Sequence, residues 1–299
     1  MPGSQTLALK HEDVEERIDL LFYRPLGAAL TRWLASTSVT PNQVSVASAV
    51  VGGLSGSLFL SESLAVNVLG MLAFVLANLL DSVDGQLARM KKMTSRLGRI
   101  LDGVAGVAIF GSIYLFLAIR LSREDGWPAL LLGAVALLSQ AFQNQMADYF
   151  RNAYLTCALP SARGELDSQA DAGRLHDEAR EGGRWYERIL FRVYRDYVWR
   201  QEMLAPRTAR LHKRLGGLTA DRRAEAAALY RTLSRPLLPH LAWLATNVRM
   251  LALFAMLIAG VPGWFFPFNL VPLNIALAVV VALNERNSQR VLAHLGGPR

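Results

Sequence analysis

Apolar residues in this chain come in long uninterrupted runs, unlike the short alternating runs of a soluble sheet protein. A bilayer core of about 30 Å needs roughly 20 predominantly apolar residues in one helix. The runs of that length lie at 43–61, 64–83, 100–121, 128–147, 238–260 and 264–284. The pattern therefore predicts an all-α integral membrane protein with six transmembrane helices.

The charges around these runs predict an orientation in the membrane. With six spans, both chain ends face the same side as the segments 89–99, 150–237 and 285–299, which hold most of the Lys and Arg residues. Loops enriched in Lys and Arg face the cytoplasm. The formal net charge of +8 follows from this rule and from attraction to anionic lipids, and no zinc spacing or RNA-binding aromatic motif supports nucleic-acid binding.

The polar segments divide the chain into four expected parts. These are an N-terminal cytoplasmic part at 1–37, spans one to four at 38–150, a cytoplasmic helical insert at 151–236, and spans five and six with a tail at 237–299. The first part places Leu30 and Trp33 among charges, with Pro25 and Gly27 as interruptions. This pattern predicts an amphipathic helix that lies in the membrane interface.

The insert carries one periodic feature and one segment without periodicity. The aromatic stripe, which has helical spacing, consists of Tyr186, Leu190, Tyr194 and Tyr197. We expect it to pack onto the membrane domain instead of forming a substrate site. The Gly, Asp and Ser residues of 161–183 favour a flexible loop.

Acidic residues at the end of the second run carry the candidate chemistry. Asp81 and Asp84 are three positions apart, so a helix presents both on one face. Asp102 opens the third run, which an antiparallel hairpin would return beside them. Three carboxylates that converge would repel one another unless a cation neutralised them, and oxygen ligands favour Mg²⁺, Mn²⁺ or Ca²⁺ over zinc. The sequence therefore predicts a divalent metal site.

The same segment carries a family resemblance. It reads DSVDGQLAR and, eight residues later, GRILD, and this pattern resembles the signature of the CDP-alcohol phosphotransferase family. The matching positions are Asp81, Asp84, Gly85, Ala88, Arg89, Gly98 and Asp102. The segment VTPNQVS, which includes Asn42, is similar to a second feature of the family. By themselves Thr40 and Pro41 predict a helix N-cap and a first helical position. The resemblance covers about 38–150 and leaves the insert unexplained.

The resemblance implies a transferase of phospholipid biosynthesis, a homodimer of six-helix bundles in a prokaryotic cytoplasmic membrane, with the site facing the cytoplasm. There Mg²⁺ or Mn²⁺ would hold the diphosphate of a lipid such as CDP-diacylglycerol, a hydroxyl acceptor would attack the β-phosphorus, and CMP would leave. By that analogy the metal ligands are Asp81, Asp84 and Asp102, with Asp102 also catalytic, and the CDP moiety is bordered by Asp84, Gly85, Ala88, Arg89 and Asn42. Phosphoryl transfer depends mainly on positioning and charge neutralisation, which this set would supply.

One position departs from the family pattern. A fourth aspartate is expected four residues after Asp102, and this chain has Gly106 there. The missing residue is the family's general base and a ligand of its second metal, and general-base catalysis is worth about 10² to 10⁴ in rate. Three interpretations stay open. Another base such as Asp148 or His240 replaces it, the acceptor deprotonates itself, or the protein binds a CDP-lipid or a partner without turnover.

Arg249 bears on the acceptor, because a guanidinium inside the fifth run is costly unless it faces a cavity or a partner. It could clamp a phosphate together with Arg151, which would suit a polyol phosphate acceptor, or it could form a structural pair. Asn247 and Arg249 are also the sequence basis for a third alternative, a transporter. The sequence leaves the acceptor open.

Overall fold

The computed structural model describes residues 12–14, 16, 18–93, 96–159 and 166–296, and within this set the side chains of residues 12 and 96–105 are not described. The described part of the chain is helical and contains no strand, which confirms the predicted all-α class. Its α-helices are α1 (Arg24–Ala35), α2 (Pro41–Leu58), α3 (Leu64–Met90), α4 (Arg96–Asp125), α5 (Trp127–Ala158), α6 (Gln169–Gly182), α7 (Trp185–Leu204), α8 (Pro206–Leu215), α9 (Ala220–Ser234), α10 (Leu238–Leu241), α11 (Thr246–Ile258), α12 (Phe265–Leu270) and α13 (Pro272–Gly296).

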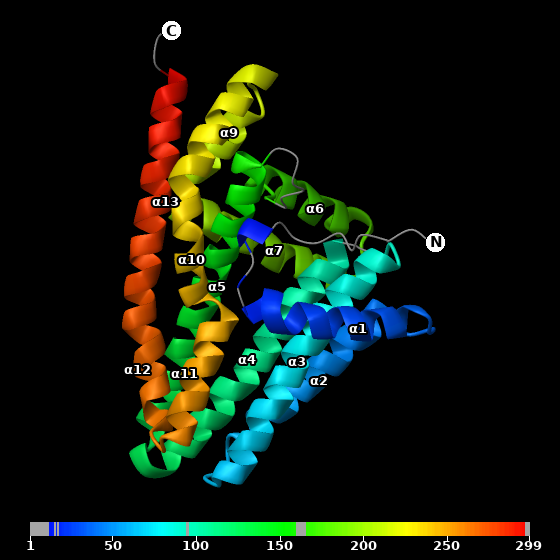
Figure 1. Ribbon diagram of the computed structural model, residues 1–299, viewed down its shortest axis with the longest axis vertical. Coiled ribbons are helices and arrows are strands. Elements are labelled where there is room, and N and C mark those ends of the chain that lie inside the picture. The colour runs from blue at the N-terminus through cyan, green and yellow to red at the C-terminus, as the bar shows by residue number, and fades with distance from the viewer. Residues whose placement is uncertain (1–11, 15, 17, 94–95, 160–165, 297–299) are drawn as a thin grey trace. The chain divides into compact units, whose positions relative to one another are not determined.

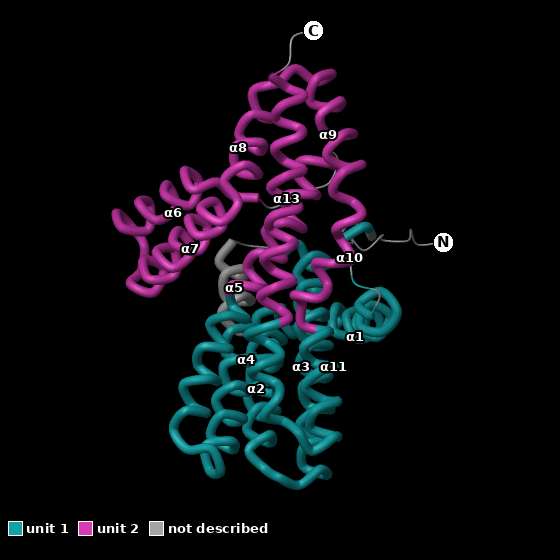
Figure 2. The backbone as a smooth tube through the Cα atoms, turned by 90° about the vertical axis from the view of Figure 1, so that its left-hand side faces the viewer, with its two compact units in different colours: residues 1–141, 247–271 teal, residues 142–246, 272–299 magenta. Residues whose placement is uncertain are grey.

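The chain forms two compact units, which are coloured separately in Figure 2. Unit 1 comprises Met1–Ala141 and Asn247–Val271, and unit 2 comprises Phe142–Thr246 and Pro272–Arg299. Unit 1 therefore holds α1 to α4 and the first half of α5, and unit 2 holds the second half of α5 and the polar helices α6 to α9.

Four helical stretches in the described part are long and apolar enough to cross a membrane. They are Leu64–Met90, Gly106–Asp125, Ala220–Ile258 and Pro262–Gly296. They correspond to the second, third, fifth and sixth predicted spans. The first and fourth predicted spans coincide with α2 and α5, which are helical but carry many Ser, Gly, Gln and Asn residues. The count of six spans therefore stays a prediction.

The fifth predicted span starts later as a regular helix than the hydropathy pattern suggests. Residues 238–245 form short, irregular helical turns, and regular α-helix resumes at Thr246. Pro236 and Pro239 precede this point, and Ala245 has an extended backbone (φ −93°, ψ 175°). Proline lacks the N–H that continues a helix, so these residues interrupt it although the apolar run continues.

Close contacts through small residues hold α2, α3 and α4 side by side in unit 1 (Figure 1). A Cβ atom on Gly52 would lie 2.6 Å from the side chain of Ile109, and one on Gly56 would lie 2.3 Å from Oγ of Ser112. Only glycine at these two positions lets α2 and α4 approach so closely. Ser48 adds a hydrogen bond of 2.8 Å to the carbonyl of Ala77 in α3.

The start of α2 confirms the predicted cap. Thr40 accepts a hydrogen bond from the backbone N–H of Gln43, and the Gln43 side chain accepts one from the N–H of Thr40. Pro41 occupies the first helical position, where its missing N–H costs nothing. This reciprocal capping box fixes the point at which the chain enters α2.

The N-terminal segment forms a π-helix at Asp19–Tyr23 and then α1. Pro25 and Gly27 do not interrupt α1. Pro25 lies in its first turn, and Gly27 faces α3, where an added Cβ atom would lie 2.8 Å from Nε2 of Gln86. Trp33 is exposed, and the interfacial position of α1 stays a prediction.

In unit 2, α8 and α9 pack along α13. Glu285 of α13 is buried and accepts hydrogen bonds from the backbone N–H groups of Arg207 and Thr208, at 2.8 and 2.9 Å, and from the Thr208 hydroxyl at 2.8 Å. The carboxylate therefore caps the N-terminus of α8 from another helix.

The expectation of a loop over 161–183 is wrong for its larger part, because α6 occupies Gln169–Gly182. Ser168 and Asp171 form a reciprocal capping box at its start, and Ala172 and Ala179 are buried on its inner side. Capping and burial of small residues outweigh the low apolar content here. Residues 160–165 lie outside the described residues.

Candidate functional site

Two of the predicted metal ligands lie at the end of α3. Asp81 is exposed, and Asp84, one turn further along, is only 6% exposed. Oδ2 of Asp84 accepts a hydrogen bond of 2.5 Å from the hydroxyl of Ser45 in α2. The arrangement is made of oxygen atoms, as Mg²⁺ and Mn²⁺ prefer. Sequence reasoning missed Ser45, because it lies 39 residues from its partner.

The small residues after Asp84 leave room that Arg89 partly fills. A Cβ atom on Gly85 would lie 3.5 Å from Nη1 of Arg89, so the guanidinium covers this glycine. Ala88 is partly buried, and Asn42 is exposed in the first turn of α2. The guanidinium of Arg89, over Gly85, is the kind of group that pairs with a phosphate.

The third predicted ligand, Asp102, belongs to α4, but its side chain lies outside the described part of the structure. Among the side chains that are described, no group of three or more His, Cys, Asp or Glu residues could hold a metal ion. A site built from Asp81, Asp84 and Asp102 therefore stays a prediction. The oxygen donors of Asp81, Asp84 and Ser45 fit a hard divalent cation chemically.

Gly106 lies one turn after Asp102 on α4. A Cβ atom built at this glycine has no neighbouring atom within 4 Å. Among the described residues, therefore, no neighbouring atom requires a glycine at this position instead of a residue with a Cβ atom.

Lys91 is a second residue that sequence reasoning did not single out. Its ammonium donates hydrogen bonds of 2.9 and 2.7 Å to the carbonyls of Thr37 and Val39, in the turn between α1 and α2. Lys91 lies in the basic segment 89–99. Its hydrogen bonds connect the end of α3 to the turn that precedes α2. No local pattern in the sequence indicates such a partner.

Asp148, the candidate substitute base, is exposed in the second half of α5, and Arg151 lies 3.7 Å from it. Both residues belong to unit 2, whereas Asp81 and Asp84 belong to unit 1. The proposed roles of Asp148 as a base and of Arg151 as a phosphate clamp therefore stay predictions.

Arg249 in α11 is completely buried, with 0% of its surface exposed. Its Nε donates a hydrogen bond of 3.3 Å to Oδ1 of Asn269, whose amide nitrogen donates to the carbonyl of Phe265. Asn247 donates to the carboxylates of Glu16 and Asp19, at 2.7 and 3.1 Å. Both intramembrane polar residues thus have partners within unit 1.

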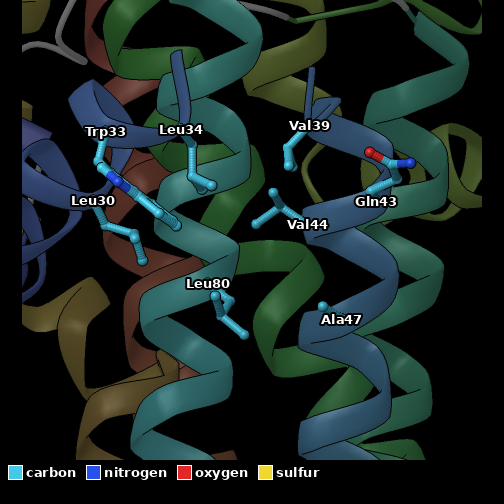
Figure 3. A pocket seen from close by; sticks show the side chains of 8 residues that line it. All are labelled: Leu30, Trp33, Leu34, Val39, Gln43, Val44, Ala47 and Leu80. Atoms are coloured by element: carbon cyan, nitrogen blue, oxygen red, sulfur yellow. The ribbon is translucent and has the colours of Figure 1, made fainter. Parts of the chain in front are cut away.

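An apolar groove of about 580 Å³ lies between α1, α2 and α3 (Figure 3). It is lined by Leu30, Trp33, Leu34, Val39, Gln43, Val44, Ala47 and Leu80. Two of these residues are close in sequence to the acidic site, because Val44 precedes Ser45 and Leu80 precedes Asp81. The groove is thus an apolar surface whose lining includes the sequence neighbours of Ser45 and Asp81.

Comparison with known proteins matches residues 38–155 to the family CDP-alcohol phosphatidyltransferase. A bifunctional IPC transferase and DIPP synthase from Thermococcus kodakarensis is 32% identical over 116 residues, which are 39% of this chain and 26% of that protein. A ceramide phosphoethanolamine synthase from Drosophila melanogaster is 33% identical over 93 residues, 27% of this chain and 24% of that protein. A CDP-diacylglycerol–glycerol-3-phosphate 3-phosphatidyltransferase from Rickettsia bellii is 30% identical over 108 residues, 36% of this chain and 59% of that protein. The chain thus spans about a quarter of the first two relatives and less than two thirds of the third.

Proposed function

We propose that this chain, whose residues 38–155 match the CDP-alcohol phosphatidyltransferase family, transfers a phosphatidyl group from a CDP-activated lipid to a hydroxyl acceptor with release of CMP. The observation that carries the proposal is the pair Asp81 and Asp84 at the end of α3, with Asp84 held by Ser45. Two carboxylates on one face of a helix end suit a diphosphate only when a cation lies between them.

The charged residues of the signature, together with Ser45, have distinct parts in this proposal. Asp81, Asp84 and Asp102 would hold Mg²⁺ or Mn²⁺, and the cation, when bound, would neutralise charge on the diphosphate oxygens. Ser45 would keep the Asp84 carboxylate in one orientation. Arg89, which covers Gly85, would place positive charge beside the departing CMP.

The groove supports a lipid as the donor. Its walls are almost entirely apolar, and its lining residues Val44 and Leu80 are the sequence neighbours of Ser45 and Asp81. An acyl chain in the groove would bury apolar surface and would leave the CDP group at the end of α3. A CDP-diacylglycerol-like lipid meets both requirements.

The acceptor is a hydroxyl compound, and a polyol phosphate is our preferred class. The name of the Rickettsia bellii relative states glycerol 3-phosphate as its acceptor. A phosphorylated acceptor could also take up its own hydroxyl proton, which would account for the missing carboxylate at Gly106. Asp148 is the alternative base from the chain itself.

Release of CMP from CDP-diacylglycerol tests the proposal directly. Purified protein is supplied with or without Mn²⁺ and offered polyols, polyol phosphates and amino alcohols. We expect metal-dependent release that falls by about 100-fold or more in Asp84→Asn, the scale of losing a main electrostatic contact. Asp177→Asn, which removes an exposed acid on α6, is the matched control and should retain full activity.

A binding protein without turnover is the second candidate, and Gly106 is the observation that favours it. Metal-dependent binding of CDP-diacylglycerol with no CMP release from any acceptor would establish this alternative and contradict the first. A transporter has less support, because Arg249 and Asn247 have hydrogen-bond partners within unit 1.

A further inference from the structure

The insert helix α7 has two different long faces. Its inner face holds Val198 and Gln201, which are buried. Its outer face carries an apolar stripe of residues that are between 48% and 74% exposed, namely Trp185, Ile189, Val193, Trp199 and Met203. Five large apolar side chains on one helix face form an exposed apolar patch that is unusual for a surface in contact with water.

The predicted aromatic stripe of α7 does not coincide with this outer face. Tyr194 donates a hydrogen bond of 2.5 Å to Asp167, and its ring stacks with that of Tyr197. Burial raises the pKa of Tyr197. These tyrosines pack within unit 2, and the exposed stripe is therefore a separate feature that the mechanism proposed above does not use.

Arginines lie on one flank of the exposed stripe and, at Arg192, within it. Arg188, Arg192 and Arg195 follow at spacings of four and three residues, and Arg184 lies just before the helix. Asp196, the acidic residue within the stripe, lies 3.2 Å from Arg195. Trp residues beside an arginine row are typical of helices that lie in the interface of a membrane with anionic lipids.

Hydrogen bonds attach α7 to α5 at the point along α5 where its exposed residues change from apolar to charged. The side chain of Gln145 donates to the carbonyl of Tyr197, and Gln201 donates to the carbonyl of Gln145. Gln145 lies between Phe142, which is exposed and apolar, and Asp148, which is exposed and charged. The guanidinium of Arg200 lies 5.9 Å from the ring centroid of Phe142.

The direction of α7 is also consistent with a helix at the membrane surface. Figures 1 and 2 show α6 and α7 as a pair that runs across the direction of α13, within the same unit. Because α13 belongs to a stretch that is long and apolar enough to span a membrane, a helix that crosses its direction would run across the membrane normal instead of along it.

From these observations we propose that α7 is an interfacial anchor whose outer face, from Trp185 to Met203, inserts into an anionic lipid surface. The arginine flank would contact phosphate headgroups, and the two tryptophans would lie at the level of the headgroups. This anchor is distinct from α1 and belongs to the insert, for which the family signature offers no role.

Nitroxide labels at single cysteines test the proposal in reconstituted full-length protein. The background variant is Cys157→Ala, which removes the single cysteine. The label positions are Ile189→Cys and Val193→Cys, and the matched control is Glu178→Cys on an exposed position of α6. In phosphatidylcholine vesicles that contain phosphatidylglycerol, we expect the α7 labels to collide more with oxygen than with an aqueous nickel chelate, and the α6 label to show the reverse.

Three results would overturn the proposal. Labels on α7 as accessible to the nickel chelate as the α6 label would show a face free in water. Strong spin–spin broadening between the α7 labels of two molecules would show a contact between copies of the chain. Equal insertion in pure phosphatidylcholine, unchanged in Arg188→Gln/Arg192→Gln, would remove the role of anionic lipid. None of these readouts depends on turnover, so a failed anchor and a failed transferase are distinguishable.

Discussion

The hydroxyl of Ser45 in α2 donates a hydrogen bond of 2.5 Å to Oδ2 of Asp84 in α3. The bond joins the first and second predicted spans at the acidic end of the family signature. It restricts rotation of the Asp84 side chain. Ser45 therefore acts as a positioning residue for a predicted ligand.

Ser45→Ala should lower the apparent affinity of the enzyme for Mn²⁺ without unfolding the protein. Loss of a residue that orients a metal ligand typically costs 10- to 100-fold in metal affinity or activity, so we expect the Mn²⁺ concentration for half-maximal CMP release to rise about tenfold or more. Ser57→Ala is the control, because that hydroxyl donates to the carbonyl of Leu54 in its own helix, at 2.8 Å. An equal response of both variants to Mn²⁺ would show that the bond to Asp84 has no functional role.

Gly106→Asp should raise the rate of CMP release if the chain lacks a general base. A Cβ atom at this position meets no atom of the described residues within 4 Å, and replacement of a helical glycine by aspartate carries no propensity cost. The rate should increase by about 10², whereas Gly106→Asn, of the same shape and without the charge, should not increase it. An unchanged rate in Gly106→Asp would instead favour a base elsewhere, such as Asp148, or deprotonation by the acceptor itself.

Asn269→Leu should destabilise the protein more than Arg249→Leu/Asn269→Leu does. The single change removes an acceptor from a completely buried guanidinium, and a hydrogen bond to a charged group contributes about 2 kcal/mol. The double change also removes the charge that needs this acceptor. Apparent thermal midpoints of the purified variants measure the difference.

The acceptor KM of Arg249→Leu distinguishes a structural role of Arg249 from a role as a phosphate clamp. If the arginine is structural, the acceptor KM of Arg249→Leu should equal that of the unmodified protein. A KM that rises for a phosphorylated acceptor, and stays constant for its unphosphorylated analogue, would identify Arg249 as part of the clamp.

His212 in α8 should make stability depend on pH. Burial lowers its pKa, and Arg223 lowers it further, whereas Asp171, Glu202 and Asp167 oppose the shift. The folded state thus favours neutral His212, while the unfolded chain binds a proton at about pH 6.5. The contribution of His212 to the free energy of unfolding is therefore complete above that pH. It is lost as the pH falls towards the lowered pKa of the folded state.

The expected result is a fall in apparent thermal midpoint between about pH 7.5 and about pH 5 that is smaller in His212→Gln than in the unmodified protein. His240→Gln, at an exposed position of α10, should leave the fall unchanged. A fall of equal size in all three proteins would assign the pH dependence to other groups.

Several features could be predicted because they depend on short stretches of chain. The helix start at Thr40 and Pro41 follows from two neighbouring residue types, and the common face of Asp81 and Asp84 follows from their spacing of three. The loop predicted at 161–183 failed for a related reason. Its composition suggested a turn, but the capping pair Ser168 and Asp171 lies within it and starts a helix.

The sequence by itself determined the helical class, the apolar runs, the family signature and the substitution at Gly106, because each is written in neighbouring residues. Only the tertiary structure decided which distant groups meet. Ser45 binds Asp84 across 39 positions, Lys91 closes the turn at Thr37 across 54, and Glu285 caps α8 across 77. The physical reason is that helix periodicity and capping act over three or four residues, whereas tertiary contacts form between residues that are close in space, whatever their separation in sequence.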